Sequence, residues 1–326
     1  SEVVFNPVED ELDAGAIAAI LAAIAAADAN QPVTGIAYVS SGVSHHTEIN
    51  GGSGNDNFSI YHNKGTLELN GEGDNDDFIV RAFVVLTGPG QGNAAVNGGS
   101  GGDTIQYAQN AQVEIDGGDG FDTIVVLGTT FGDTFVVTSE GIFGAGLTIY
   151  YDNIESVELD TLEGNDTIYV LSTASDLVTT IIGGQGSDSI HVLGDVILPI
   201  DTNDPNAGNL QGQDLGSIQG PLVLEGGALA DRDRSLVAAV VLPGELNPVS
   251  GQENLFVEEA ESIDILNIFH TDNGTIQSGA LLFRDDSTDI ANTGLALTGF
   301  GMGGDLTIDE GETGSPQYVT YGGGIT

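Results

Sequence analysis

One short motif rich in glycine and aspartate recurs along the chain and limits what the chain can fold into. The segments 98–105 (GGSGGDTI) and 117–124 (GGDGFDTI) both fit the pattern G-G-x-G-x-D-x-U-x, where U is a large apolar residue. Two further full matches lie at 51–59 and 183–191. Four full matches in 326 residues indicate a repeated structural unit rather than a coincidence.

This motif resembles the nonapeptide repeat of the RTX family, which folds as a calcium-binding β-roll. The resemblance covers residues 45–195 well, and the remainder is similar only in style to large, repetitive bacterial surface and adhesin-like proteins. It implies that the glycines form tight turns whose carbonyls point at an ion. The Asp of each loop then supplies a carboxylate to calcium, which takes six to eight oxygen ligands. One loop cannot surround an ion, so two stacked loops are required.

The spacing of the motifs predicts the architecture. The interval from Asp56 to Asp76 is almost the same as the interval from Asp103 to Asp122. Two strands of five to six residues and two turns fill about that length, so one unit corresponds to one coil of a stacked structure. We therefore expect an all-β fold, a right-handed parallel β-roll or β-helix, with Asp56 over Asp76 and Asp103 over Asp122. Asp166 and Asp188 form a looser third pair.

Some loops depart from the pattern. Segment 71–78 is interpreted as carrying one extra residue, so either Asp74 or Asp76 could hold the ligand position. The loops at Asp133 and Asp166 lack the leading glycine pair, and the long separations 76–103 and 133–166 predict insertions that interrupt the stack. The resemblance implies several calcium ions, and the expected ligands and loop glycines are Gly52, Gly54, Asp56, Gly71, Gly73, Asp74, Asp76, Gly99, Gly101, Asp103, Gly118, Asp119, Gly120, Asp122, Asp133, Gly164, Asp166, Gly184, Gly186 and Asp188.

Glutamates precede several loops at one equivalent position, between apolar neighbours. Strand alternation predicts that these side chains point outward as a ladder of like charges. The ladder would be a solvated face that limits aggregation or, alternatively, a second row for cations. Its expected members are Glu48, Glu68, Glu114 and Glu158.

We expect three regions. Residues 1–44 form a short strand and an Ala-rich helix at about 13–29, a cap or docking element. Residues 45–200 form the RTX-like calcium β-roll, and residues 201–326 form a β-rich region that continues the stack with insertions, including an oxygen-rich loop at 201–209 and a charged cluster at 231–234. Residues 321–326 resemble the start of segment 144–155, which suggests a unit completed by a longer chain or by a neighbouring copy.

The charge balance narrows the choice of partners and compartment. The chain has 49 acidic and 5 basic residues and a net charge of -44, so nucleic acid and anionic membranes are poor partners. The apolar run 14–27 has no basic residue before it and is too short to span a bilayer. There is no cysteine, which excludes disulfides and thiolate sites. A large, calcium-seeking chain of this kind suits an extracellular, secreted or cell-surface protein.

Catalytic signatures are missing from the sequence. It has no cysteine nucleophile, no G-x-S-x-G elbow and no H-E-x-x-H helix. We expect no enzyme but a calcium-stabilised extracellular structural protein, a subunit or repeat segment of a surface filament or matrix, which self-associates or continues a longer repetitive chain. The alternatives are a monomeric adhesin or carbohydrate-binding module and a polysaccharide-cleaving β-helix enzyme. Few basic residues and no Trp count against the enzyme.

Overall fold

The computed structural model describes most of the predicted repeat region and parts of the C-terminal region. The described residues are 2–3, 45–60, 65–80, 95–108, 112–129, 131–145, 147–194, 214–227, 263–270, 278–285, 293–311 and 315–326. The predicted helix at 13–29, the loop at 201–209 and the charged cluster at 231–234 lie outside these residues. No helix within the described ranges is long and apolar enough to cross a membrane.

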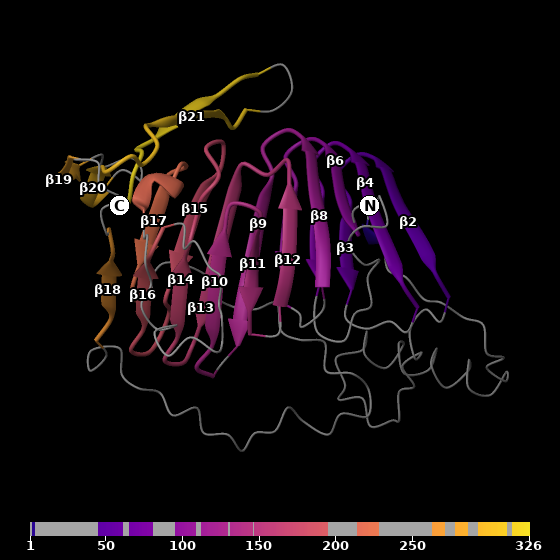
Figure 1. Ribbon diagram of the computed structural model, residues 1–326. Coiled ribbons are helices and arrows are strands. Elements are labelled where there is room, and N and C mark those ends of the chain that lie inside the picture. Colours follow the sequence, from indigo (N-terminus) through magenta and orange to yellow (C-terminus); the bar gives the residue numbers. More distant parts are fainter. Residues whose placement is uncertain are drawn as a thin grey trace, which may run out of the picture.

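The described part of the chain is nearly all β and consists mainly of two sheets (Figure 1). The eight-stranded sheet runs in the order β1 (Glu2–Val3), β3 (Asn57–Ile60), β5 (Asp77–Val80), β7 (Thr104–Tyr107), β9 (Thr123–Thr129), β13 (Ser156–Leu162), β15 (Val178–Ile182) and β17 (Leu222–Glu225). The ten-stranded sheet runs in the order β18 (Ile265–Ile268), β16 (Ser189–Val192), β14 (Thr167–Val170), β10 (Thr134–Thr138), β11 (Gly141–Gly144), β12 (Leu147–Asp152), β8 (Gln112–Asp119), β6 (Val96–Ser100), β4 (Leu67–Gly73) and β2 (Thr47–Ser53). The prediction of an all-β fold is confirmed.

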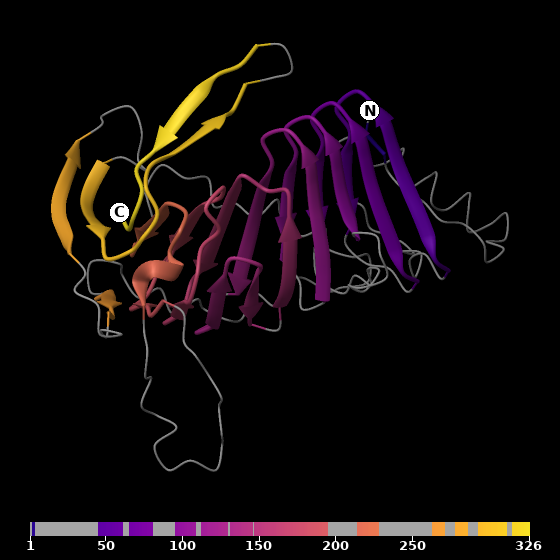
Figure 2. The ribbon, with the colours of Figure 1, turned by 45° about the horizontal axis from the view of Figure 1, so that its top comes forward.

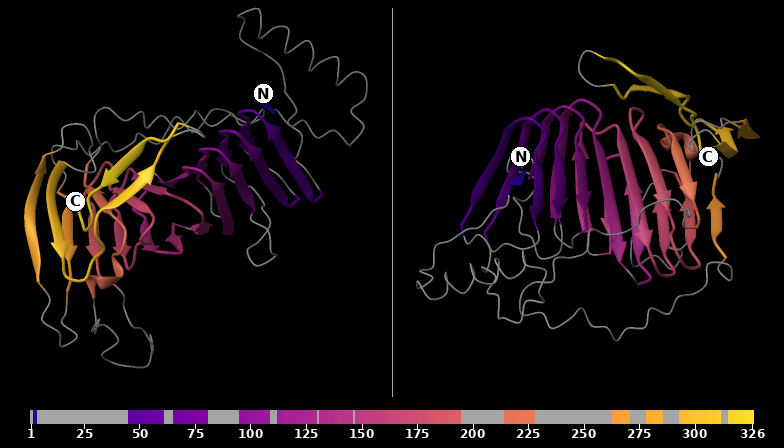
Figure 3. Two further views of the ribbon diagram at one scale, coloured as in Figure 1. Left: turned by 90° about the horizontal axis from the view of Figure 1, so that it is seen from above. Right: turned by 180° about the vertical axis from the view of Figure 1, so that it is seen from behind.

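The chain passes alternately through the two sheets, and we call one passage through both a coil. β2, β4, β6 and β8 lie in the ten-stranded sheet, and each is followed by a strand of the eight-stranded sheet. Each strand pairs in parallel with the equivalent strand of the next coil, so that Phe58, Phe78, Ile105 and Ile124 are directly in register. The views from above and behind show the same progression of strands from one end to the other (Figure 3).

Alternation of apolar and polar residues places the core between the sheets. Strands such as β5 and β7 bury every second side chain, as expected for strands that face a core on one side. The inward residues form ladders of like side chains, and the rings of Phe58 and Phe78 stack at 4.6 Å with an interplanar angle of 7°. Stacking identical positions in this way makes each coil bury the core of its neighbour.

One coil contributes three strands to the ten-stranded sheet. β10, β11 and β12 form an antiparallel meander within this sheet. β12 pairs in parallel with β8 of the preceding coil, and β10 pairs in parallel with β14 of the next. In the eight-stranded sheet β9 and β13 pair directly. The chain therefore leaves β9 and returns to β13 after a detour confined to one sheet.

The C-terminal segments pack at the far end of the stack. The hairpins β19 (Gly279–Asp285)–β20 (Thr293–Gly299) and β21 (Leu306–Asp309)–β22 (Tyr318–Tyr321) lie at this end, with the second leaning over the sheets (Figure 2). Ile325 bridges Leu222 in parallel and Leu297 in antiparallel fashion. The last residues thus lie beside β17, next to the eight-stranded sheet.

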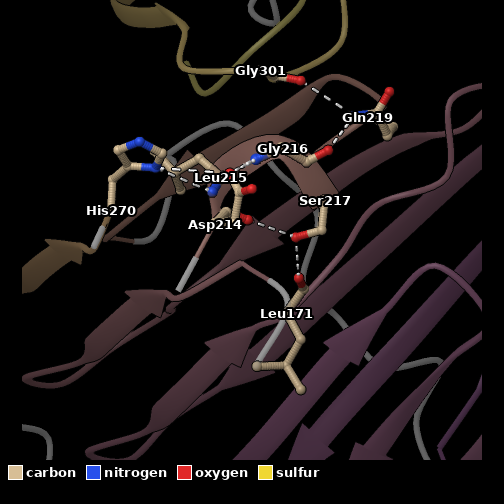
Figure 4. A network of polar contacts seen from close by, with 8 residues as sticks. All are labelled: Leu171, Asp214, Leu215, Gly216, Ser217, Gln219, His270 and Gly301. Atoms are coloured by element: carbon tan, nitrogen blue, oxygen red, sulfur yellow. Dashed lines mark hydrogen bonds and ion pairs between the residues drawn. The ribbon is translucent and has the colours of Figure 1, made fainter. Parts of the chain in front are cut away.

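A polar network around the 3-10 turn η1 (Leu215–Ser217) links the C-terminal segments to the stacked strands (Figure 4). Asp214 caps the turn by accepting the Gly216 amide at 2.9 Å. The Ser217 hydroxyl donates at 2.9 Å to the carbonyl of Leu171, the residue that follows β14. The Leu215 amide donates to His270 Nδ1 at 3.5 Å. The turn therefore connects β14 to the segment that follows β18.

We predict that Phe78→Ala lowers the free energy of unfolding by about 3–5 kcal/mol, because it deletes a fully buried ring from the core ladder. Phe131→Ala is the matched control, since the Phe131 side chain is 60% exposed, and should change stability by less than about 0.5 kcal/mol. Denaturant unfolding followed by circular dichroism measures both. Equal effects of the two substitutions would contradict the assigned core.

Candidate metal centre

Six loops between the sheets share one backbone conformation. In the loop of Asp103, Gly99 and Gly101 have positive φ values of 110° and 136°, and the Asp follows two residues after the second. The same spacing of two positive-φ residues and an Asp is found in five other loops, formed by Gly52, Gly54 and Asp56; Glu72, Asp74 and Asp76; Gly118, Gly120 and Asp122; Leu162, Gly164 and Asp166; and Gly184, Gly186 and Asp188. A conformation that favours glycine therefore sets where each Asp lies.

Four of the predicted Asp residues form one hydrogen-bonded row, which we call the first row. The Asp56 amide donates to Asp76 Oδ1 at 2.7 Å, and the Asp76 amide donates to Asp103 Oδ1 at 2.7 Å. The Asp103 amide then donates to Asp122 Oδ1 at 2.8 Å. The predicted interruption between Asp76 and Asp103 is therefore wrong, because the additional residues lie outside the loops and leave the row continuous.

A second row repeats this pattern farther along the chain. The predicted insertion between the loops of Asp133 and Asp166 is present as the extra strands β11 and β12. It does not separate the two loops, because the Asp133 amide donates to Asp166 Oδ1 at 2.7 Å. The Asp166 amide donates to Asp188 Oδ1 at 2.9 Å, and the Asp188 amide donates to Asp264 Oδ1 at 3.0 Å. Asp133 is half-buried, whereas Asp166 and Asp188 are buried.

The two rows lie at opposite edges of the sheets. The first row lies where the chain passes from the ten-stranded to the eight-stranded sheet, as from β4 to β5. The second row lies at the reverse crossings, as from β13 to β14. The change comes before the meander β10–β12, because only one strand, β9, lies between Asp122 and Asp133. The loop of Asp133 therefore follows a strand of the eight-stranded sheet, and the loop of Asp166 follows β13 of the same sheet. For the same reason Glu158 lies on the eight-stranded sheet, so the predicted ladder with Glu48, Glu68 and Glu114 of the ten-stranded sheet is wrong for this member.

The loop 71–76 contains no extra residue, contrary to the prediction. The pairing of β2 with β4 places Glu72 beside Gly52 and Gly73 beside Ser53. Asp76 consequently occupies the row position, and the alternative assignment of Asp74 to that position is wrong. Asp74 takes a positive-φ position instead, and its Oδ2 accepts the Gly54 amide at 2.8 Å.

The loop of Asp166 shows how other residues can replace the leading glycine pair. Thr161 stands in the place of the first glycine, and its hydroxyl donates to the Gly183 carbonyl at 2.6 Å. Leu162 stands in the place of the second and has a positive φ of 69°. The loop therefore keeps the shared conformation without the glycines of the full motif.

Three other predicted site residues lie beside the rows rather than in them. Gly71 is buried and precedes the positive-φ pair, and Gly73 lies between the two members of that pair. Asp119 is exposed and ends β8, where its carbonyl accepts the Gly101 amide at 2.8 Å. These residues lie within or beside the loops, whereas the carboxylates of the rows come from other residues.

Four of the row carboxylates use their two oxygens differently, whereas Asp133 Oδ2 accepts the Thr129 amide at 2.8 Å. Oδ1 accepts the amide of the preceding coil, whereas the buried Oδ2 atoms of Asp76, Asp103, Asp122 and Asp166 have no hydrogen-bond partner among the described residues. In Asp76, Asp103 and Asp122 this Oδ2 faces the first glycine of its own loop. A Cβ on Gly98, for example, would lie closer than 3.0 Å to Asp103 Oδ2 and to the Gly117 carbonyl oxygen. Carboxylate and carbonyl oxygens therefore converge beside this glycine.

Burial and like charge raise the pKa values of these carboxyl groups. Burial raises the pKa of Asp103 and of Asp166 to about 6, and that of Asp122 to about 7. Neighbouring carboxylates add to the effect, since Asp76 acts on Asp103, and Asp103 acts on Asp122. Hydrogen bonds from backbone amides oppose it. At neutral pH the rows therefore hold a negative charge that favours binding a proton or a cation.

The arrangement fits a cation bound by mixed oxygen ligands. No group of three or more His, Cys, Asp or Glu side chains converges among the described residues, so an ion here requires carbonyl oxygens besides the carboxylates. Calcium accepts both kinds of ligand, and the unpartnered Asp Oδ2 atoms are suitable donors.

Comparison of the chain with protein-family models, curated proteins and solved structures finds no match.

Sequence reasoning missed the carboxylate at the end of each row. Glu155 follows Asp122, whose amide donates to Glu155 Oε2 at 2.8 Å, and Asp264 follows Asp188. The motif that would indicate Asp264 is split in the sequence, because Gly226 supplies its first glycine and Asp264 comes only much later in the chain. A Cβ on Gly226 would clash with Asp264 Oδ2, as in the other loops. Nothing in the nonapeptide pattern indicates Glu155.

We predict that, in the presence of a chelator, the protein is more stable at about pH 5 than at about pH 8. The folded pKa values of Asp103, Asp122 and Asp166 lie above the ordinary value of 3.8, so the folded state binds more protons than the unfolded chain. The stabilisation is complete below pH 3.8 and is lost as the pH rises through about 6 to 7. Thermal unfolding across this range measures it.

The control for this pH dependence is the triple variant Asp103→Asn, Asp122→Asn and Asp166→Asn. It removes these three titrations and retains the other acidic residues, so its pH profile should be flatter. A profile as steep as that of the wild type would assign the effect to the overall negative charge instead.

We predict that Gly98→Ala destabilises the protein by about 1–3 kcal/mol, because the new Cβ displaces the Asp103 carboxylate or a backbone carbonyl. Gly73→Ala is a matched control in the neighbouring coil, since its Cβ would make ordinary contacts of 3.6 and 3.8 Å. Chemical denaturation in the presence and absence of calcium compares the two. Similar losses would show that crowding beside the carboxylate is not the reason for glycine.

Proposed function

We propose that this chain is a right-handed parallel β-roll of the RTX type, held together by several calcium ions, and that it serves as an extracellular structural protein. It would be a subunit or repeat segment of a surface filament or matrix. The observation that carries this proposal is the pair of aspartate rows, in which Asp76, Asp103, Asp122 and Asp166 are buried. In these four, one carboxylate oxygen accepts the amide of the preceding coil and the other lacks a partner among the described residues.

Calcium would be held by the loop carboxylates together with loop carbonyl oxygens. Asp56, Asp76, Asp103 and Asp122 supply the carboxylates of the first row, and Asp133, Asp166 and Asp188 supply those of the second. A bound divalent ion supplies positive charge between coils. The chain itself positions the ligands, because backbone amides orient the Asp Oδ1 atoms and glycines let the carbonyl oxygens approach.

Ion binding coupled to folding suits an extracellular protein. Extracellular calcium modules bind with dissociation constants of about 10⁻⁴–10⁻³ M, which keeps them loaded outside cells and empty inside. A site that binds only the folded state adds about 4 kcal/mol when the ion is a thousandfold above its Kd. Several such sites would make the calcium-loaded protein very stable, while the net charge of -44 opposes compaction without ions.

Self-association or continuation into further coils is supported by the open end of the ten-stranded sheet. Leu266 is in register with the buried core residues Ile190 and Ile168 but is 51% exposed. Its neighbour Ile265 is 50% exposed, and β18 is the last strand of this sheet within the described ranges. A further strand there would cover a core position that the described chain leaves in solvent. We propose neither a catalytic role nor a nucleic-acid partner.

The deciding experiment is a calcium titration of chelator-treated protein, with circular dichroism, thermal unfolding and light scattering recorded together. We expect calcium to raise the unfolding temperature and the β signal. Growth of scattering with calcium would support a filament or matrix subunit, whereas a stable monomer would favour an isolated adhesin module. A chelated chain that is already fully stable and insensitive to calcium would contradict the proposal.

The double variant Asp103→Asn and Asp122→Asn should separate charge from hydrogen bonding. Asn retains an oxygen that can accept the amide of the preceding coil but carries no charge. At pH 8 in chelator we expect the variant to be more stable than the wild type, and to lose about 4 kcal/mol of calcium stabilisation per disabled site. Glu140→Gln, which removes an exposed charge on the β10–β11 turn, is the control and should behave as the wild type.

A further inference from the structure

The first row ends at a turn that does not contain the repeated motif. Residues 153–155 connect β12 to β13, and the flanking Asp152 and Ser156 are in register with Asp116 and Thr123. Three residues therefore replace the six of the loop 117–122. The turn is too short to form a second loop of the same kind.

Glu155 nevertheless takes the place that an Asp holds in the other coils. The Asp122 amide donates to Glu155 Oε2 at 2.8 Å, and the Asp103 amide donates to Asp122 Oδ1 at the same distance, 2.8 Å. The additional methylene of Glu compensates for the shorter backbone. Glu155 is half-buried, so its carboxylate lies at the end of the buried row.

Other oxygens converge at this junction without a hydrogen-bond donor. Asp122 is fully buried, and its Oδ2 has no hydrogen-bond partner among the described residues. This oxygen lies 2.7 Å from the point where a Cβ on Gly117 would be, and the carbonyl oxygen of Asn153 lies closer still to that point. A carboxylate oxygen and a carbonyl oxygen thus lie on the same side of Gly117, one from each coil.

We propose that Asp122, Glu155 and the Asn153 carbonyl form a divalent-cation site that closes the first row. The inference rests on the proposed function, because calcium is the ion expected to fill it. Hard divalent cations bind carboxylate and carbonyl oxygens of this kind. The short turn offers fewer carbonyls than a full loop, so this site binds calcium more weakly than its neighbours and fills last.

The test uses the full chain and calcium alone. Glu155→Gln retains an oxygen for the Asp122 amide but removes the charge. Native mass spectrometry should count one calcium ion fewer, or the affinity of one site should fall on the order of tenfold. Hydrogen exchange should lose calcium-dependent protection at 118–122 and 153–156, whereas 184–188 in the second row should be unchanged. Glu140→Gln should match the wild type.

Two outcomes would overturn the assignment and can be told apart. If the wild type gains calcium-dependent protection and Glu155→Gln is unchanged, Glu155 is not a ligand, although the proposed function stands. If the wild type itself gains no protection in either row, the proposed function fails together with this site.

If the Glu155→Gln chain does not fold, a second variant and a measurement on the wild type still test the proposal. Glu155→Asp keeps the charge but shortens the side chain, so it should also lose the ion. In the wild type, segment 153–156 should become protected at a higher calcium concentration than segment 99–103. Protection of both segments at one concentration would overturn the claim that this site fills last.

Discussion

Burial of stacked aspartate carboxylates is the constraint on which the rest of the structure depends. Each Asp amide bonds to the Asp of the next coil, which fixes the register of the loops. The same contact brings like charges about one strand spacing, ~4.8 Å, apart. Two unit charges at that separation repel by about 3 kcal/mol at an effective dielectric constant of about 20. The rows therefore favour the binding of protons or cations, and the raised pKa values of Asp103 and Asp122 result from burial together with this repulsion.

The single strand β9 between Asp122 and Asp133 divides this charge between two edges. A full coil of two strands would have placed Asp133 in the same row as Asp122. Instead, Asp56, Asp76, Asp103 and Asp122 lie at one edge, and Asp133, Asp166 and Asp188 lie at the other. Each row then ends in a carboxylate outside the unbroken motif, Glu155 or Asp264. The meander β10–β12 comes after this change, and its three strands end at the same edge as a single strand would, so both sheets remain continuous.

The repeated loops were predictable from the sequence, whereas the edge at which each loop lies was not. Positive φ favours glycine and the Asp must reach the next coil, so the pattern identifies Gly101 and Asp103 directly, and the all-β fold follows from the same spacing. Motif spacing measures the length of a coil but does not show how many strands lie within it. The segment from Asp133 to Asp166 contains two extra strands, of which β11 pairs with its sequence neighbours β10 and β12, and β12 also pairs with the distant strand β8. The role of Glu155 could not be predicted from the motif for a related reason, since it depends on a turn that is shorter than the loop of the preceding coil.

Two sets of interactions thus hold the coils together. The inward ladder of Phe58, Phe78, Ile105 and Ile124 is buried, and its hydrophobic contribution scales with the apolar area removed from water rather than with charge. The Asp rows carry titratable charge, so their contribution depends on pH. If calcium binds them as we propose, calcium and protons would compete for the same carboxylates, and low pH would stabilise the calcium-free chain while it weakened calcium binding. On that proposal the stability of the protein would be set by the solution around it, which is the physical reason for proposing an extracellular, calcium-rich setting.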